Sequence, residues 1–415
     1  NYMYPDLMKN YQISQYDLPL CRNGWLNIEV NGEVKRVGII RVHLEEDTAR
    51  LLHRTDPSGE TYSLVDVNRS GVPLLEIVTA PDLRSPEEAR AFLVKLRTIL
   101  QYLGVSSGSM EEGSLRCDAN VSVRPAGETK FGTKVEIKNM NSFRSVYRAL
   151  AYEIERQVNL LKAGQQVVQE TRGWLEDKGI TVPQRTKEYA HDYRYFPEPD
   201  LPPLTPDPEW VESLRRQLPE LPDARRDRFM AEYGLGRYDA NLLTEEKALA
   251  DFFEEAVRLT GTRPGLSRIP LPQRAKSLAN WLLNETRGLM EATGRTLAET
   301  GLRPEHYVEL IELLEDGTLS SRLAKQVFEE AFRTGKLPRQ VVAEQGLVRI
   351  TDADQLLGII DRVIAENPAA VADYQKGKAQ ALTFLVGQVM KATRGKADPA
   401  LTNRLLKERL EAGSG

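Results

Sequence analysis

The chain has 415 residues, 28% of them charged, and a formal net charge of −4. This length exceeds what one hydrophobic core normally organises, so two or three domains are expected. The slightly acidic balance argues against a protein that coats nucleic acid nonspecifically, and no apolar run approaches the roughly 18 residues of a membrane-spanning helix. Cys21 and Cys117 are too far apart in the sequence to suggest a disulfide framework or a zinc site, which predicts a cytoplasmic protein without membrane contact.

The first predicted element is a β-hairpin. Residues 25–30 alternate apolar and polar side chains, the dipeptide Asn31-Gly32 favours a type I′ turn, and residues 34–46 continue as a second strand. The sequence therefore predicts two antiparallel strands near the start of the chain.

The second strand ends in an acidic cluster, His-Leu-Glu-Glu-Asp at residues 43–47. On a strand, His43 and Glu45 share one face and Glu46 lies on the other. That other face is apolar: Ile40, Val42 and Leu44. A carboxylate on an apolar face needs a partner or a metal ion, so Glu46 is a candidate metal ligand. A solvated acidic strand end is an equally weighted alternative.

Two helices and a further strand follow. The pattern Ser85-Pro86-Glu87-Glu88 is a capping box with proline at the first helical position, and apolar residues at helical spacing continue to Leu103. Residues 115–124 alternate without a break and predict a strand. A second helix is expected from Phe143 to about Leu161, with Asn141 or Ser142 as its N-cap.

Polar residues in and before the predicted strand 115–124 form a second candidate site. Glu112 precedes the strand, and Arg116, Asp118 and Asn120 share its polar face. Mg²⁺ typically takes one or two protein carboxylates plus phosphate oxygens, and arginine forks onto an anion, so this combination suits Mg²⁺ with a phosphorylated ligand. Ordinary cross-strand ion pairs are the alternative. The sequence has no Walker-type phosphate loop and no Gly-x-Ser-x-Gly motif, which disfavours the common nucleotide and serine hydrolases.

Aromatic and charged side chains concentrate at residues 191–200. Arg194 and Tyr195 in this segment suit stacking on a nucleotide base or on the terminal adenosine of an RNA. Anchoring of an irregular segment to the sheet is an alternative of even weight. Lys138 is a further polar candidate just before the second helix.

Six prolines between Pro197 and Pro208 forbid regular structure and mark the first domain boundary. The sequence after Trp210 is expected to be all-helical. A last small helical unit is expected from about Gly346, with Asp352 as a candidate N-cap.

The last part of the chain is locally basic. Between Lys376 and Arg409, eight Lys or Arg stand against two acidic residues. Lys391, Arg394 and Lys396 lie close together in a predicted turn between helices. Phosphate contacts to folded RNA would use such side chains, and a solvated helical face is the alternative.

Taken together, these segments resemble the B subunits of the tRNA-dependent amidotransferases, the GatB family. The matching motifs occur in one order along the chain: residues 1–7, 10–16, 43–47, 68–74, 111–114, 192–197 and 386–390. The resemblance implies an α+β protein with an antiparallel-sheet cradle domain over residues 1–207. An all-α helical domain over residues 208–345 and a small α-helical tail similar to YqeY proteins over residues 346–415 are expected to follow.

The resemblance also implies a reaction. In that family, ammonia released by the amidase-type A subunit (GatA), which is accompanied by the small C subunit (GatC), reaches the B subunit. The B subunit uses ATP to phosphorylate the side-chain carboxylate of Glu on tRNA(Gln), or of Asp on tRNA(Asn), and then amidates it. Phosphorylation supplies the leaving group that a carboxylate lacks, and Mg²⁺ offsets charge on the transferring phosphate.

The resemblance assigns roles to residues of this sequence. It implies that Glu46 and Asp118 are Mg²⁺ ligands near the phosphorylation centre, with Glu45 as a further candidate ligand and Glu112 and Arg116 adjacent. The substrate-facing or tRNA-binding candidates are then Lys138, Arg194, Tyr195, Lys391, Arg394 and Lys396.

One departure from the family pattern affects the metal site. The family ordinarily begins with a strand carrying Gly-Leu-Glu-Val-His, whose acid and imidazole complete the metal site, and the present sequence starts after it. The resemblance therefore implies an incomplete metal site in this chain. Zinc-binding members hold zinc in that same portion, so no zinc is expected from Cys21 or Cys117.

Two alternatives accompany this interpretation. The archaeal relative GatE carries a large inserted domain with no visible counterpart in this sequence, so the GatB family is preferred. A non-catalytic tRNA-binding scaffold in the same complex is the alternative function, and the choice between tRNA(Gln) and tRNA(Asn) is left open.

Overall fold

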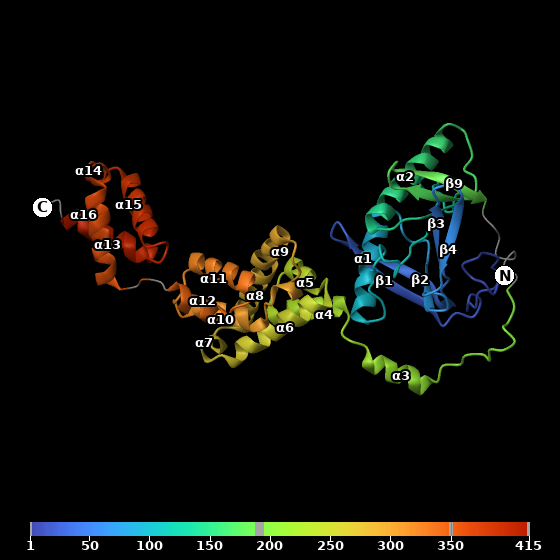
Figure 1. Ribbon diagram of the computed structural model, residues 1–415, viewed down its shortest axis with the longest axis horizontal. Helices are drawn as coiled ribbons and strands as arrows, with labels where there is room; N and C mark the ends of the chain where they lie inside the picture. The colour runs from blue at the N-terminus through green and yellow to red at the C-terminus, as the bar shows by residue number, and fades with distance from the viewer. Residues whose placement is uncertain (1, 187–194, 348–349, 351, 413–415) are drawn as a thin grey trace. The chain divides into compact units, whose positions relative to one another are not determined.

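The computed structural model describes residues 2–186, 195–347, 350 and 352–412 (Figure 1). It divides into two compact units, Asn1–Pro219 and Glu220–Gly415. The named strands all belong to the first unit, and the named elements of the second are helices. The α+β class is therefore confirmed, while the division into three domains stays a prediction.

The predicted hairpin forms the start of a three-stranded antiparallel sheet. β1 (Cys21–Val30) pairs with β2 (Glu33–Glu46), and β5 (Pro73–Thr79) pairs with the other edge of β2. At the turn, Asn31 has φ 54° and Gly32 has φ 81°, the positive values that a type I′ turn requires.

At the end of β2, His43 and Glu45 share one face and Val42, Leu44 and Glu46 share the other, as predicted, because the register with β5 is regular over these residues. The register with β5 shifts between Ile39 and Arg41, and such a β-bulge changes which side chains face the core. Ile40 is 47% exposed, whereas His43 is fully buried. The bulge thus removes Ile40 from the predicted apolar face, and the full burial of His43 on the opposite face was not predicted.

α1 (Pro86–Tyr102) covers this sheet by packing Phe92 and Leu96 against residues of β1 and β2. As predicted, the Ser85 side chain caps the helix by accepting a hydrogen bond from the Glu88 amide. In a capping box the Glu88 carboxylate would accept a hydrogen bond from the Ser85 amide. Here it accepts one from the Arg84 amide instead, at 2.6 Å.

A four-stranded mixed sheet forms the other half of the first unit. Its order is β6 (Ala119–Val121), β7 (Val135–Lys138), β8 (Glu170–Leu175) and β9 (Ile180–Thr186). β7 and β8 are parallel, which departs from the all-antiparallel cradle expected above. The helix α2 (Phe143–Lys162) connects them, as a parallel pair requires. Ser142 caps α2, as predicted.

The predicted strand 115–124 is much shorter in the structure. Only Ala119–Val121 pairs with β7, which is itself short: it begins at Val135, opposite Val121, and ends at Lys138, where Asn139 turns the backbone with φ 65°. Burial nevertheless alternates along residues 113–121 as it would in a strand. The side-chain pattern was thus predicted correctly, and the hydrogen-bonded strand was not.

Between β2 and β5 the chain forms a separate two-stranded sheet, β3 (Arg50–Thr55) and β4 (Thr61–Asp66). The chain leaves the main sheet after Glu46 and re-enters it at Pro73, and these two residues are register partners. The segment between β2 and β5 therefore begins and ends at neighbouring residues of the same sheet.

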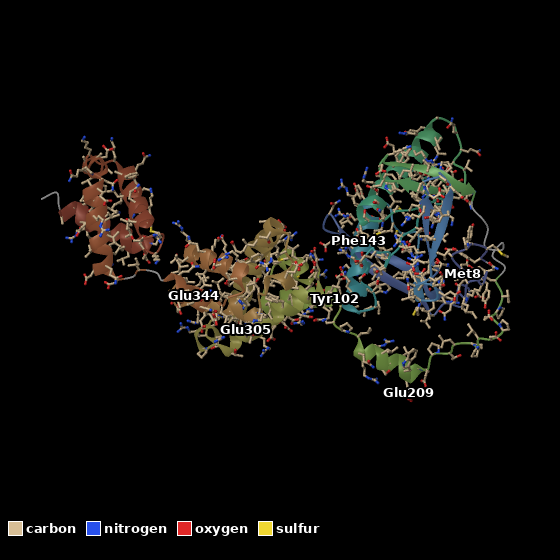
Figure 2. All side chains as sticks on the ribbon, in the orientation of Figure 1. Met8, Tyr102, Phe143, Glu209, Glu305 and Glu344 are labelled. Carbon is tan, nitrogen blue, oxygen red and sulfur yellow. The ribbon has the colours of Figure 1, made fainter. Side chains whose placement is uncertain are left out.

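The proline-rich segment ends in a solvated helix. Residues 195–207 contain no helix or strand, as predicted. They lead into α3 (Pro208–Gln217), which buries none of its residues and leaves Trp210 53% and Leu214 44% exposed. Its side chains project into solvent around the labelled Glu209 in Figure 2.

The second unit is helical, as predicted, and holds two separate hydrophobic cores. Residues of the first core include Phe253, Tyr307 and Phe328, and residues of the second include Leu356 and Leu385. The elements of the first are α4 (Pro222–Tyr233), α5 (Arg237–Thr244), α6 (Lys247–Thr262), α7 (Pro264–Ser267), α8 (Leu271–Asn280), the π-helix η2 (Trp281–Thr286), α9 (Arg287–Thr293), the 3₁₀-helix η3 (Leu297–Thr300), α10 (Pro304–Glu315), α11 (Ser321–Thr334) and α12 (Pro338–Gln345).

The last four helices surround the second core. They are α13 (Ala353–Glu366), α14 (Pro368–Gln375), α15 (Ala379–Ala392) and α16 (Pro399–Ala412). Asp352 caps α13 by accepting a hydrogen bond from the Asp354 amide, as predicted. Within the described part of the chain, no helix has the length and apolar character needed to cross a bilayer.

Candidate metal and active site

Three potential metal ligands converge where β2 and β5 run side by side. His43 on β2 is the register partner of Glu76 on β5, and Glu45 follows His43 on the same face of β2. One ligand atom from each of the three lies within 4.8 Å of the others. His43 Nε2 lies 3.1 Å from a Glu45 carboxylate oxygen. Solvent exposure increases across the cluster. The side chain of His43 is fully buried, that of Glu45 is 14% exposed and that of Glu76 is 48% exposed.

The electrostatics of this cluster fit a divalent cation. Partial burial raises the pKa of Glu76, and the negative charge of Glu45 raises it further, with a smaller effect from Asp118. Two carboxylates that repel each other beside an imidazole are a donor set that a divalent ion satisfies. His43 Nδ1 is also buried without a hydrogen-bond partner among the described residues.

Residues 12–16 run along the end of β2 and hold its acids in place. Ser14 Oγ donates to Glu45 at 3.0 Å, and Gln12 Nε2 donates to the other Glu45 oxygen at 3.3 Å. Gln15 forms two hydrogen bonds with the backbone of Leu44. Its backbone amide donates to the Leu44 carbonyl, and its side-chain oxygen accepts from the Leu44 amide. The Glu45 carboxylate is therefore oriented by neutral donors, which leaves its charge available to a cation.

Tyr16, at the end of this segment, contacts the cluster through its ring. It meets the His43 ring edge-on at 6.3 Å between centroids, and the Arg41 guanidinium carbon lies 4.7 Å from its centroid. Tyr195 stacks on Tyr16 at 4.7 Å with 3° between the ring planes. This stack places Tyr195 close to the end of β2, although the two are far apart in the sequence.

Glu46 points away from His43 and Glu45 and has a partner of its own. Lys9 Nζ lies 2.5 Å from its carboxylate, and the Ile13 amide donates to the same oxygen at 3.5 Å. Its predicted role as a Mg²⁺ ligand stays a prediction.

Asp47, the next residue, is held by two arginines. Arg116 Nη2 bonds one of its oxygens at 2.7 Å, and Arg69 Nε lies 3.1 Å from the other. The Asp47 side chain is 8% exposed, while those of Arg69 and Arg116 are 33% and 47% exposed. The buried carboxylate thus orients two half-exposed guanidinium groups. The turn that carries Glu112 adjoins them, since a side chain at Gly113 would contact Arg69.

Asp118 and Lys138 form an ion pair at 2.7 Å on the edge of the mixed sheet. The negative charge of Asp118 contributes a small part of the raised pKa of Glu76. Of the candidates predicted from sequence, the structure places Glu45 in the cluster, pairs Asp118 with Lys138, and holds Arg116 against Asp47. Arg194 lies outside the described residues.

Two of the three basic candidates of the tail, Arg394 and Lys396, lie between α15 and α16, as predicted, and Lys391 lies in the last turn of α15. Arg394 has φ 52°, and the Lys396 carbonyl accepts a hydrogen bond from the Ile350 amide at 2.6 Å. A tight turn thus displays them together.

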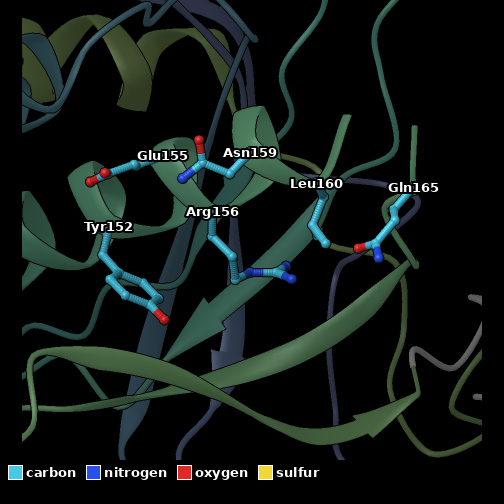
Figure 3. Close-up of a pocket in the computed structure, with 6 residues that line it drawn as sticks. All are labelled: Tyr152, Glu155, Arg156, Asn159, Leu160 and Gln165. Atoms are coloured by element: carbon cyan, nitrogen blue, oxygen red, sulfur yellow. The ribbon is translucent and has the colours of Figure 1, made fainter. Parts of the chain in front are cut away.

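A surface pocket of about 410 Å³ lies elsewhere, along α2 (Figure 3). Its lining includes Tyr152, Glu155 and Arg156. The Arg156 guanidinium is engaged by the fully buried carboxylate of Glu153, at 2.5 and 2.9 Å. The charge of Arg156 is therefore compensated by the interior of the sheet, which leaves Glu155 as the other charged side chain among the lining residues.

Comparison with known proteins identifies the family. The family model for the GatB/GatE catalytic domain matches residues 1–212, and that for the GatB domain matches residues 267–410. The chain is 56% identical over 410 residues to the B subunit of the aspartyl/glutamyl-tRNA(Asn/Gln) amidotransferase of Carboxydothermus hydrogenoformans, a match that covers 99% of the chain and 83% of that protein. The chain belongs to the GatB family. The resemblance inferred from its motifs is confirmed.

Other GatB proteins match to the same degree. The corresponding protein of Moorella thermoacetica is 56% identical over 410 residues, with 99% of the chain and 83% of that protein covered. That of Thermomicrobium roseum is 56% identical over 411 residues with the same coverage. The chain is thus an amidotransferase B subunit that carries the catalytic domain of the GatB family.

The sequence reasoning missed two residues of the site. Glu76 lies in a mostly apolar strand with no acidic neighbour, and only the β2–β5 register brings it to His43. Arg69 lies in the turn before β5 and reaches Asp47 through tertiary folding. The motif at residues 68–74 contains Arg69, but the motif alone indicates only the family and assigns Arg69 no role.

Proposed function

We propose that this chain, in a complex with GatA and GatC, uses ATP and Mg²⁺ to phosphorylate the side-chain carboxylate of Glu on tRNA(Gln) or of Asp on tRNA(Asn). It then amidates the activated group with ammonia from GatA. The observation that carries the proposal is the convergence of His43, Glu45 and Glu76 within 4.8 Å inside the part that matches the GatB/GatE catalytic domain.

In this proposal His43, Glu45 and Glu76 hold the divalent cation. The bound cation would offset the negative charge of the transferring phosphoryl group. The half-exposed position of Glu76 leaves one side of the cluster open to a phosphate-bearing substrate, while the buried side fixes the imidazole. An open side is what a catalytic cation needs, because Mg²⁺ usually keeps positions for water and phosphate oxygens.

The remaining candidates act around the transferring group. Arg116, oriented by Asp47, offers outward N–H groups to a phosphate oxygen. Asp118 and Lys138 lie toward Glu76, where a carboxylate and an ammonium suit the binding of cation and anionic substrate respectively. Glu46 and Glu112 keep their predicted catalytic roles, with Glu46 positioned by Lys9.

The tail is proposed to bind tRNA. Lys391, Arg394 and Lys396 are displayed by one turn, and phosphate contacts by such residues are the main source of RNA affinity. Arg194 and Tyr195 remain substrate-facing candidates in this scheme.

The test uses the chain reconstituted with GatA and GatC. Asp118→Ala and Glu46→Ala should each abolish ATP-dependent amidation of mischarged tRNA while tRNA affinity and glutaminase activity remain. Glu33→Ala, an exposed acid on the same strand as Glu46, is the control. Undiminished amidation in both site variants would instead support a non-catalytic tRNA-binding scaffold. Running the assay with Glu-tRNA(Gln) and with Asp-tRNA(Asn) separates the two substrates.

A further inference from the structure

We propose that Tyr16 is a positioning residue for the cation site, and that Tyr195 holds Tyr16 in place by stacking on it. The inference rests on the proposed role of His43, Glu45 and Glu76 as cation ligands. It gives Tyr195 a structural role in the site in addition to the substrate-facing role proposed above.

The backbone near Tyr16 is fixed by the strand that carries the ligands. The Gln15 amide donates to the Leu44 carbonyl at 3.0 Å, and the Gln15 side-chain oxygen accepts from the Leu44 amide at 3.0 Å. Ser14 forms a bridge to Glu45. Tyr16 therefore starts from a defined position beside β2.

His43 lacks the usual second anchor of a metal-binding histidine. Such a histidine normally donates its other ring N–H to a carboxylate, carbonyl or water, which fixes the ring orientation. Here Nε2 faces Glu45 at 3.1 Å, and Nδ1 is buried with no hydrogen-bond partner among the described residues. The orientation of the ring must then depend on packing, and Tyr16 supplies an aromatic contact at 6.3 Å and 89°.

Tyr16 reaches a second ligand through Arg41. The Arg41 guanidinium lies over the Tyr16 ring at 4.7 Å, and Arg41 Nη2 lies 3.9 Å from the Glu76 carboxylate. A cation over an aromatic face is attracted by the electron-rich ring. Tyr16 thus contacts His43 directly and influences Glu76 through Arg41.

Tyr195 limits the movement of the Tyr16 ring. The two rings are parallel within 3° at 4.7 Å, a stacked arrangement that aromatic pairs favour. Tyr16 is only partly buried, so the stack supplies contact that the protein core does not. The segment that begins at Tyr195 is in this way coupled to the geometry of the cation cluster.

The experiment measures Mn²⁺ affinity of the full chain in its complex, with free Mn²⁺ followed by electron paramagnetic resonance. Tyr16→Leu and Tyr195→Leu should each weaken binding by about 10-fold, the lower end for residues that orient metal ligands. Tyr16→Phe and Tyr195→Phe keep the rings and should bind Mn²⁺ as the unaltered protein does. Phe131→Leu is the matched control, because it removes a ring that has Arg124 4.6 Å above it in the loop between β6 and β7.

The outcomes separate this inference from the proposed function. Loss of Mn²⁺ binding in Glu76→Gln together with unchanged binding in both leucine variants would overturn the role of Tyr16 and leave the cation site intact. Unchanged affinity in Glu76→Gln, or no Mn²⁺ binding by the unaltered protein, would overturn both. If Tyr195→Leu raises the KM for tRNA or ATP without changing Mn²⁺ affinity, Tyr195 contacts substrate and the positioning role is wrong. If Tyr16→Leu fails to fold, the Mn²⁺ affinities of Tyr195→Leu and of the two phenylalanine variants still test the inference.

Discussion

His43 and Glu76 face each other across β2 and β5, as register partners in adjacent antiparallel strands. One is fully buried and the other is half-exposed, so the pair leads from the interior of the sheet to its surface. A cation held between them would be fixed on one side and accessible on the other.

Replacing Glu76 tests this arrangement directly. Glu76→Gln removes a charged ligand and should weaken Mn²⁺ binding by about 100-fold or more, given that outer-shell changes alone cost 10–100-fold. The fold should persist because the side chain is 48% exposed. Isothermal titration with Mn²⁺ gives the affinity, and Glu33→Gln on the exposed part of β2 is the control. Equal affinity in the two variants would exclude Glu76 as a ligand.

Asp47 is expected to matter for stability as well as activity. Asp47→Asn removes the charge that Arg69 and Arg116 share at 3.1 and 2.7 Å, and it leaves two guanidinium groups to repel each other. We expect a loss of about 2 kcal/mol in the free energy of unfolding of the first unit, as for a charged hydrogen-bond partner that is removed. Urea denaturation measures it. Asp177→Asn in the exposed turn between β8 and β9 should change the free energy little, and a similar loss there would contradict the argument.

The buried acid of α2 should make stability depend on pH. Burial opposes ionisation of Glu153, but hydrogen bonds from Arg156, Gln157 and Thr181 outweigh it and hold the pKa of Glu153 below its ordinary value of 4.5. The folded protein therefore binds this proton less tightly than the unfolded chain. The stability that Glu153 contributes is complete above pH 4.5 and is lost as the pH falls through the lowered value.

Glu153→Gln should therefore destabilise the protein by about 3 kcal/mol at pH 7, with a smaller difference from the unaltered protein below pH 4.5. Denaturation curves between these pH values test both parts. Glu155→Gln is the control, since this acid is exposed on the same helix and is labelled in Figure 3. A difference that does not change with pH would mean that Glu153 acts by shape and not by charge.

The tail prediction concerns tRNA affinity. Replacing Lys391, Arg394 and Lys396 together by alanine should weaken tRNA binding and reduce the slope of log K against log salt by about 2 to 3, since each phosphate contact contributes about 0.7 to 0.9. Deleting the residues after Gly346 should weaken tRNA capture further and leave glutaminase activity in GatA unchanged. Filter binding across a salt series measures the slope. Three exposed basic residues elsewhere in the second unit serve as the charge-matched control: Arg287, Lys325 and Arg333. Tight binding after the deletion would refute the role of the tail.

Features encoded by neighbouring residues were predictable from the sequence. Asn31-Gly32 formed its hairpin turn because both residues accept positive φ, and Ser85, Ser142 and Asp352 became helix caps because their side chains bond amides only two or three residues away. Each of these predictions depended on a single short segment.

Features that depend on pairing between distant strands were not predictable. The bulge between Ile39 and Arg41 took Ile40 out of the predicted apolar face of β2. The strand predicted at residues 115–124 was cut short because its partner β7 spans only Val135–Lys138. Glu76 entered the site for the same reason, since its position follows from register and not from any local pattern. Two of the three residues of the cluster, His43 and Glu45, therefore lay in one sequence motif, and the third, Glu76, did not.

The pairing of Glu46 with Pro73 closes residues 47–72 into a loop whose ends are anchored in one sheet. The free energy needed to close a loop grows slowly with its length. The tip of the β3–β4 hairpin, around Ser58 and Gly59, can therefore be lengthened or carry an inserted fluorophore without changing the spacing of His43 and Glu76. It is a practical attachment point for single-molecule measurements on the assembled complex.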